Sequence, residues 1–388
     1  MTFSHRLATG MLGFSAIACV TTAAIWAQQG QPQIGIAPVV VANEPYTFDT
    51  AEQHKIRVVV VARGLAHPFS LTFLPNGDAL VTERGERLRL VRNATGRGEG
   101  PLLVPQPVGG VPETPAFRGG GLQEVVLHPQ FATNGLVYFT YNKAGEPGPK
   151  PPQRHSAVTL ARGRFDGSSL TNIQELFVGE WSLGASGSRV VFAPDGFVYM
   201  TTGAPFGDQA QKLDNVYGKV LRLREDGRVP SDNPFTKRAG TRPEIFSYGH
   251  RDQLGIAVHA GTGTVLTAEH GPNGGDEINV ILPGRNYGWP TFSFGRDYQG
   301  PRISATPFGE GIEPPLVVWL PSIAPTGLTF YTGDRFPAWK GNLFVGSARR
   351  GEVPRTGGLE RVVLNDKLEE LRRETLLAEL HQRIRDVR

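Results

Sequence analysis

The residue types best suited to chemistry gather in one stretch of the chain, between positions 248 and 290. This stretch reads Tyr-Gly-His-Arg-Asp-Gln-Leu-Gly over 248–255, Ala-Glu-His-Gly-Pro-Asn-Gly-Gly-Asp-Glu-Ile-Asn over 268–279, and Asn-Tyr-Gly-Trp-Pro over 286–290. Arginine binds carboxylates in a bidentate manner, and histidine and acidic side chains transfer protons. Three common catalytic signatures are absent: the phosphate-binding Gly-x4-Gly-Lys-Ser/Thr loop, the Gly-x-Ser-x-Gly elbow and the His-Glu-x-x-His zinc pair.

Short strands joined by tight turns must position these residues. A motif recurs in which an apolar segment, a turn with Pro or Gly, and a second apolar segment follow one another, usually ending in Thr. Asn-Gly or Asp-Gly supplies the positive φ that a tight hairpin turn needs. The five copies span residues 71–82, 125–140, 191–201, 256–267 and 328–345.

The spacing of these hairpins indicates the fold class. Their turn glycines lie between 58 and 78 residues apart, which is enough for four strands and their loops. Such a unit is typical of a propeller blade rather than of a solenoid turn. The alternative is an irregular β-sandwich in which similar turns recur by chance. We therefore predict an all-β protein, with a propeller as the favoured architecture.

The first 27 residues resemble a secretory signal peptide. A short start with one Arg precedes an uncharged run over residues 7–27 that ends in small residues. A membrane anchor is the alternative, and a lipoprotein attached through Cys19 is another. Cys19 is the only cysteine, so a mature chain would contain neither disulfides nor thiolate metal sites. We predict a periplasmic or secreted protein without a stable membrane span.

The rest of the chain is predicted to be one large domain. Residues 28–56 are rich in Pro, Gln and Val, and we interpret them as a linker leading into a first strand; residues 57–388 form the propeller. The formal net charge is only +4, and no Lys/Arg run has the density of a nucleic-acid-binding patch. Nucleic acid is therefore not an expected partner.

The motifs of residues 248–290 are similar to the signature of the glucose/sorbosone dehydrogenase family, whose soluble members carry PQQ. Further matches lie at 218–235, at 336–339 and in the terminal Arg-Ile-Arg-Asp-Val-Arg of 383–388. The resemblance implies a six-bladed propeller of four-stranded antiparallel blades. It also implies oxidation of an aldose at C1 to a lactone, with hydride passing to calcium-bound PQQ and on to an external electron acceptor.

The resemblance also implies a cofactor site. PQQ is a flat o-quinone with three carboxylates, so several cations are needed to bind it. Carried over residue by residue, Arg251 lies near the reactive carbonyl as a catalytic residue, and the carbonyls of Gly271 and Pro272 hold the calcium. The other cofactor-binding residues implied are His270, Asp276, Arg349, Arg383 and Arg385. A second, structural calcium would be held by the carbonyls of Glu277, Tyr287 and Asp297 and by the carboxylate of Glu313, although an ordinary acidic loop is equally consistent with this part of the sequence.

The chain departs from the family at the residues that handle protons. Ala185 stands where relatives have the His that takes the proton of the C1 hydroxyl. Gly119 replaces a Gln, and Asp252 follows Arg251 where relatives have Asn. Three interpretations remain open: a dehydrogenase whose base is Asp252, Asp208 or His270; a propeller that binds PQQ or another polyanion with little oxidation; and a structural or carbohydrate-binding propeller. We count Asp252 as a catalytic candidate.

The end of the chain carries two further expectations. Relatives continue beyond Arg-Asp-Val-Arg with a hairpin that fills the last blade, so the sixth blade is expected to be incomplete and the chain to be a fragment or an unclosed ring. The leucine spacing over 366–380 favours a helix. The family has strands there, and we expect strands.

Overall fold

A computed structural model describes residues 35–388 except 53–54, 97–99, 115–119, 151–152 and 185. The predicted signal peptide, with Cys19, lies outside the described residues. Residues 36–388 form one compact unit. Within the described part of the chain, no helix has the length and apolar character needed to cross a bilayer.

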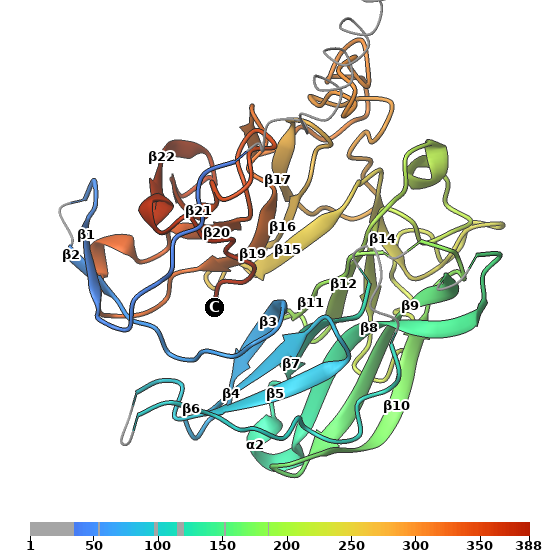
Figure 1. The fold of residues 1–388 in the computed structure, drawn as a ribbon. Helices are drawn as coiled ribbons and strands as arrows, with labels where there is room; N and C mark the ends of the chain where they lie inside the picture. The colour runs from blue at the N-terminus through green and yellow to red at the C-terminus, as the bar shows by residue number, and fades with distance from the viewer. Residues whose placement is uncertain (1–34, 53–54, 97–99, 115–119, 151–152, 185) are drawn as a thin grey trace, which may run out of the picture. The chain divides into compact units, whose positions relative to one another are not determined.

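The compact unit is built almost entirely from antiparallel sheets (Figure 1). Among the described residues, five sheets have four strands each, and we call them blades 1 to 5 in chain order. The strands of blades 1 and 2 are β3 (Pro68–Phe73), β4 (Ala79–Glu83), β5 (Arg87–Arg92), β6 (Leu102–Leu103), β7 (Leu122–Leu127), β8 (Leu136–Pro147), β9 (Arg154–Phe165) and β10 (Leu170–Val178). Those of blades 3 to 5 are β11 (Val190–Phe192), β12 (Val198–Thr202), β13 (Lys219–Leu223), β14 (Ile245–Tyr248), β15 (Gln253–Val258), β16 (Val265–Glu269), β17 (Asp276–Val280), β18 (Val317–Trp319), β19 (Pro325–Phe330), β20 (Leu343–Ser347), β21 (Gly358–Leu364) and β22 (Glu370–Leu376).

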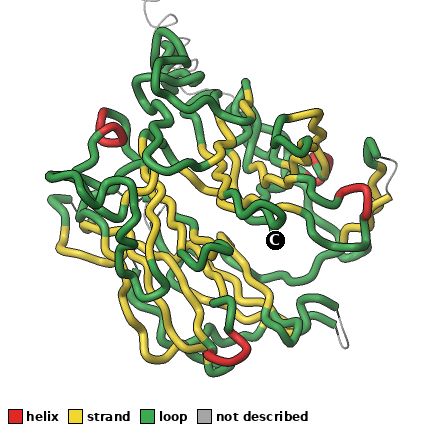
Figure 2. Tube along the Cα trace, turned by 180° about the vertical axis from the view of Figure 1, so that it is seen from behind, coloured by secondary structure: helices red, strands yellow, loops and turns green. Residues whose placement is uncertain are grey.

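The remaining elements are short and lie outside the blades. A two-stranded sheet pairs β1 (Tyr46–Asp49) with β2 (Lys55–Val58), so the region predicted as a linker holds two paired strands, and the pair runs past residue 56. The helical turns are α2 (Phe131–Asn134), η1 (Asp208–Gln211), η2 (Pro337–Trp339) and η3 (Ala378–Leu380). Figure 2 shows how little helix accompanies the strands.

The five predicted hairpins are confirmed, and each forms the first two strands of one blade. Phe73 pairs with Ala79 beside the turn in blade 1, Phe192 with Val198 in blade 3, and Phe330 with Leu343 in blade 5. Each hairpin then continues through two further antiparallel strands. The all-β, propeller-type prediction therefore holds for five four-stranded blades.

Apolar clusters lie between successive blades and hold them together. The second strand of a blade is buried on both faces, because consecutive side chains point to opposite sides of a sheet. On β8, for example, Tyr138 packs in the cluster shared with blade 3, and Phe139 packs in the cluster shared with blade 1. Two more clusters join blade 3 to blade 4 and blade 4 to blade 5.

The segment 366–380 contains strand β22 over residues 370–376, as the family resemblance predicts, followed by the short turn η3, and it does not form the helix that the leucine spacing favours. Strand β22 pairs with β21 in a register that sets Arg361 opposite Glu374. Leu368 adopts a positive φ in the turn between the strands, and Leu376 packs in a cluster with Ile56 of β2. Cross-strand pairing and this contact outweigh the helical propensity of the segment.

The hairpin geometry brings the candidate residues to one edge of the sheets. In blades 1, 4 and 5 the start of the first strand pairs with the end of the second, as Pro68 with Glu83, Gln253 with Glu269, and Pro325 with Ser347. Residues just before a first strand and just after a second strand therefore lie together. The C-terminus lies among these inner strands (Figures 1 and 2).

Candidate active site

Two adjoining cavities open among the loops at these strand ends. The larger has a volume of about 410 Å³ and the smaller about 150 Å³, and Arg385 lines both. Together the cavity walls contain Arg84, Arg349, Arg383 and Arg385, against the carboxylates Asp252 and Glu352. The pair of cavities therefore presents an excess of positive charge and suits an anionic ligand.

The smaller cavity brings together most residues of the predicted cofactor site. Its walls include Arg349, Arg383 and Arg385, which come from two separate segments of the chain. Arg349 forms an ion pair with Glu352. Among the described contacts, the guanidinium groups of Arg383 and Arg385 donate no hydrogen bond, so they can bind a further anion.

The charge on Arg385 is costly where it lies. Burial, together with the nearby cations Arg189 and Arg383, lowers the pKa of this guanidinium to about 9. Its face rests on the ring of Phe69 at 5.1 Å. A carboxylate ligand would relieve that cost, because an opposite charge favours the charged form of a group.

Arg251 lies beside the same cavity and is fixed by neighbours that line it. Its Nη1 donates to the carbonyl of His270 at 3.0 Å, and its Nη2 donates to the Tyr298 hydroxyl at 3.2 Å. The guanidinium carbon lies 5.5 Å from the ring centre of Phe206 and 5.6 Å from that of Trp289. The four predicted arginines thus converge on one region.

The turn after β16 presents backbone oxygens to the smaller cavity. Gly271 and Pro272 both line it, and among the described contacts neither carbonyl accepts a hydrogen bond. Free carbonyl oxygens are hard donors that suit calcium. The carbonyls of Gly271 and Pro272 therefore fit the role predicted for them, which is to hold a calcium ion next to the quinone.

Asp276 holds this turn in place rather than facing the cavity. One carboxylate oxygen accepts from the amide of Gly271 at 2.8 Å. The other accepts from the Ser322 hydroxyl at 2.5 Å and from the amides of Ile323 and Ala324 at 2.6 and 2.7 Å. We expected Asp276 in the wall of the cofactor site; its side chain is buried behind that wall as a positioning residue.

His270 lines the smaller cavity in a neutral form. Burial is the main cause that lowers its pKa. Its Nε2 lies 2.6 Å from the carbonyl of Pro325, and a carbonyl only accepts, so Nε2 carries the proton. The other ring nitrogen is then left as an acceptor.

Asp252 lies in the wall of the larger cavity. Its carboxylate packs on two glycines: a Cβ atom at Gly187 or Gly203 would come within 2.7 or 2.6 Å of its Oδ1. Among the described contacts neither carboxylate oxygen accepts a hydrogen bond. Arg84 and Arg385 share the cavity, and their electrostatic interaction with this carboxylate favours the charged guanidinium groups. Asp252 is thus an open acceptor facing a cationic cavity.

The other residues considered as proton acceptors do not line the described cavities or lie outside the described residues. Asp208 is exposed, pairs with Lys212 at 3.1 Å and lines neither cavity. Ala185 and Gly119, at the positions where the sequence departs from the family, lie outside the described residues. Of the candidate bases in the described chain, Asp252 and His270 line a cavity.

The predicted set for a second calcium is only partly assembled. Glu313 lies next to the segment of Tyr287, since its amide donates to the carbonyl of Asn286 at 2.8 Å. Its carboxylate forms an ion pair with Arg285 at 2.6 Å. Burial and the neighbouring carboxylate Glu269 raise the pKa of Glu277 well above its usual value.

The remaining member of this set, Asp297, lies in a tight turn. Its carbonyl accepts from the amide of Gly300 at 2.9 Å. No described contact joins it to Glu277, Tyr287 or Glu313, and no three His, Cys, Asp or Glu side chains of the described chain cluster closely enough to hold a metal.

Arg84 was missed by the sequence analysis. It follows β4 directly, as His270 follows β16, so the strand-end position was a usable signal. Its Nε donates to the carbonyl of Gly120 at 3.2 Å. The terminal nitrogens make no described hydrogen bond, so they can bind a ligand in the larger cavity, which Arg84 lines.

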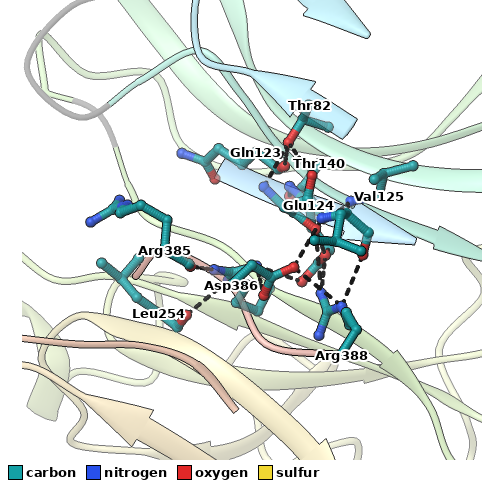
Figure 3. A network of polar contacts seen from close by, with 12 residues as sticks. Thr82, Gln123, Glu124, Val125, Thr140, Leu254, Arg385, Asp386 and Arg388 are labelled. Carbon is teal, nitrogen blue, oxygen red and sulfur yellow. Dashed lines mark hydrogen bonds and ion pairs between the residues drawn. The ribbon is translucent and has the colours of Figure 1, made fainter. Parts of the chain in front are cut away.

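A buried ion network fixes the segment that carries Arg383 and Arg385 (Figure 3). Arg189 donates to Asp386 at 3.0 Å and to the carbonyl of Arg385 at 2.9 Å. Arg388 donates to Glu124 at 2.6 Å, and the amide of Leu71 donates to Asp386 at 2.9 Å. The Arg385 side chain points away from this network. The backbone on which it stands is therefore held by blades 1, 2 and 3.

Comparison with known proteins identifies similar chains. The family model described as glucose/sorbosone dehydrogenase matches residues 65–388. A curated relative, the aldose sugar dehydrogenase YliI of Escherichia coli K12, is 37% identical over 343 residues, which cover 86% of this chain and 87% of that one.

Solved structures agree with this match. The apo form of the soluble aldose sugar dehydrogenase of E. coli superposes with a TM-score of 0.75 at 34% identity, covering 84% of this chain and 90% of that one. The PQQ-bound aldose sugar dehydrogenase of Streptomyces coelicolor superposes with a TM-score of 0.66 at 26% identity, covering 90% of each chain.

Proposed function

The chain belongs to the glucose/sorbosone dehydrogenase family of PQQ-type soluble sugar dehydrogenases, and we propose that it oxidises aldose sugars at C1 to lactones with PQQ and calcium bound in the two cavities. The observation that carries the proposal is the convergence of Arg349, Arg383 and Arg385 on one cavity whose wall also offers the carbonyls of Gly271 and Pro272. Arginines suit the three carboxylates of PQQ, and carbonyl oxygens suit calcium. Bound PQQ would supply the quinone that accepts a hydride from C1.

In this proposal Asp252 is the proton acceptor. Its carboxylate would take the proton of the C1 hydroxyl as the hydride leaves C1, so the sugar loses one hydride and one proton, that is two electrons and two protons in all. Arg84 and Arg385 share the larger cavity with this carboxylate, and its charge favours the charged form of both guanidinium groups. Arg251 would stabilise negative charge on the quinone oxygen, as the family resemblance implies.

We also infer that residues 382–388 occupy the inner position of a sixth blade. The amide of Ile384 donates to the carbonyl of Ser347 in blade 5, and Asp386 contacts Leu71 in blade 1. A segment bonded to both neighbours bridges blades 1 and 5, as an inner propeller strand would. We place the protein in the periplasm or outside the cell from its predicted signal peptide, with an external electron acceptor.

A dye-linked aldose assay on protein reconstituted with PQQ and calcium tests the activity. We expect a measurable rate that requires both additions. PQQ binding without sugar oxidation would instead support a non-catalytic PQQ-binding propeller. Absence of PQQ binding would leave a structural or carbohydrate-binding role.

Ala185→His is expected to raise turnover about tenfold, less than the 10²–10⁴-fold that a positioned general base contributes, because Asp252 already serves as the base in this proposal and Gly119 also differs from the residue of relatives. The measurement is the dye-linked rate of both proteins at equal PQQ saturation. PQQ affinity should stay the same. An unchanged rate, with PQQ bound in both, would show that a histidine at this position cannot act as the base.

A further inference from the structure

One hairpin rises above the face on which the cavities open. Strands β8 and β9 have 12 residues each, whereas β4, β12, β16 and β20 have five. On β8, Asn142 lies level with the site, since its side chain reaches the carbonyl of Ser186 at 3.5 Å. Residues 143–147 continue beyond that level by roughly 17 Å at the usual rise of a strand. The hairpin forms a wall beside the larger cavity.

Trp181 lies on this wall with its ring exposed. Ser182 pairs with Ser156 of β9 through two backbone hydrogen bonds of 2.7 and 3.0 Å, which hold Trp181 against the hairpin. A Cβ atom on Gly145 would lie 2.5 Å from the indole, so the ring approaches the β8 backbone as only glycine allows. Trp181 is nevertheless 49% exposed. A large aromatic face is thus rigidly presented to solvent.

A hollow of about 540 Å³ lies over this ring. Trp181, Glu146, Arg154 and His155 line it. Arg154 is fixed by the carbonyl of Gly145 at 3.0 Å and by Glu113 at 2.8 Å. Among the described contacts, the carboxylate of Glu146 has no partner. An exposed indole with charged and polar groups at its rim matches the mixed surface of a sugar ring, which has apolar C–H faces and hydroxyl edges.

The hollow and the larger cavity are lined by residues that are adjacent in the chain. Ser182, the residue after Trp181, lines that cavity together with Gly184 and Ser186. A small pocket that adjoins the larger cavity is lined by the same three residues with Glu180 and Ser156, and Ser156 follows His155 of the hollow in the chain. A chain of linked sugars with its reducing end at Asp252 could therefore extend past Ser182 onto the indole.

We propose that Trp181 forms a distal glycosyl-binding subsite, so that oligosaccharides with a free reducing end are preferred over monosaccharides. This inference rests on the proposed oxidation of aldoses in the adjoining cavity. The terminal sugar lies in the cavity, and a following glycosyl unit stacks on the indole. The subsite adds binding energy for the longer substrate alone.

The test compares kcat/KM for D-glucose with that for maltotriose and cellotriose in the PQQ- and calcium-loaded protein. We expect at least one trisaccharide to be preferred, and Trp181→Ala to reduce that preference about five- to tenfold through KM. Glucose kinetics should not change. Trp181→Phe keeps an aromatic face and should retain most of the preference. Phe308→Ala, which removes a 61% exposed ring that lines none of these cavities, is the matched control.

Two outcomes would overturn the inference: equal kcat/KM values for all three sugars in the wild type, or an equal loss for glucose and trisaccharide in Trp181→Ala. If the loaded protein oxidises none of the sugars, the proposed activity is wrong, and a binding measurement then tests the subsite independently of activity. Titration calorimetry with maltotriose and cellotriose should then show binding that Trp181→Ala weakens. Unchanged or undetectable binding of both would overturn the subsite as well.

Discussion

Asp252→Asn is expected to lower kcat for aldose oxidation by about 10²–10⁴-fold while PQQ remains bound. The amide has the shape of the carboxylate and preserves its packing on Gly187 and Gly203, but it cannot take a proton. The two glycines leave room for a side chain of this size, and among the described contacts nothing donates to the carboxylate. The loss should therefore appear in the rate of the chemical step. Single-turnover reduction of the loaded protein by D-glucose measures it.

Asp208→Asn is the matched control for this prediction. Asp208 is a second acid considered as base, and it is exposed, paired with Lys212 and outside both cavities. Its substitution should leave kcat within about twofold. If Asp252→Asn retains the wild-type rate and His270→Gln loses it, the base is His270 and the assignment to Asp252 is wrong.

Asp386→Ala is expected to destabilise the protein by about 3–5 kcal/mol, because removing one member of a buried ion network leaves the other charges without compensation. The side chains of Asp386, Arg189 and Glu124 are 4%, 1% and 0% exposed. The substitution removes the partner of Arg189 at 3.0 Å and of the Leu71 amide at 2.9 Å. Urea unfolding followed by circular dichroism measures the change.

An exposed ion pair provides the comparison. Asp334 contacts Lys340 at 2.9 Å with side chains that are 92% and 61% exposed. Asp334→Ala should leave the free energy of unfolding essentially unchanged, because an exposed ion pair contributes little to stability. A loss below about 1 kcal/mol in Asp386→Ala would mean that the network does not hold the terminal segment.

The local pattern predicted the blades because a hairpin is specified within a dozen residues. Three of the hairpins have an Asn-Gly or Asp-Gly turn between apolar runs and the other two have a turn glycine after Thr or Lys, and all five pairs are present in the structure. The helix that the leucine spacing favoured over 366–380 is not formed, because the spacing reflects helical propensity alone and not the pairing of β22 with β21. The pairing of β1 with β2 was not seen, because the residues between them carry no strong turn signal.

In the candidate site, too, some features could be predicted from the sequence and others could not. The convergence of Arg349 with Arg383 and Arg385 came from motif positions in a family and not from spacing. Packing behind the wall could not be predicted, because Asp276 turns its carboxylate toward four backbone and hydroxyl donors. Arg84 was missed because only its position after β4 marked it, and no family motif did. Contacts between distant segments depend on how blades meet, which short motifs do not encode.

The central claim is that the cationic cavity binds PQQ, and a PQQ titration in the presence of calcium tests it most directly. Tryptophan fluorescence can follow the titration in wild type, Arg385→Ala and Arg238→Ala, the last an exposed arginine outside both cavities. We predict saturable binding of one PQQ per chain, weakened by about 1–3 kcal/mol in Arg385→Ala, as expected for one charged hydrogen-bond partner, and unchanged in Arg238→Ala. Failure of the wild type to bind PQQ with calcium present, or equal affinity in the Arg385 variant, would contradict the claim.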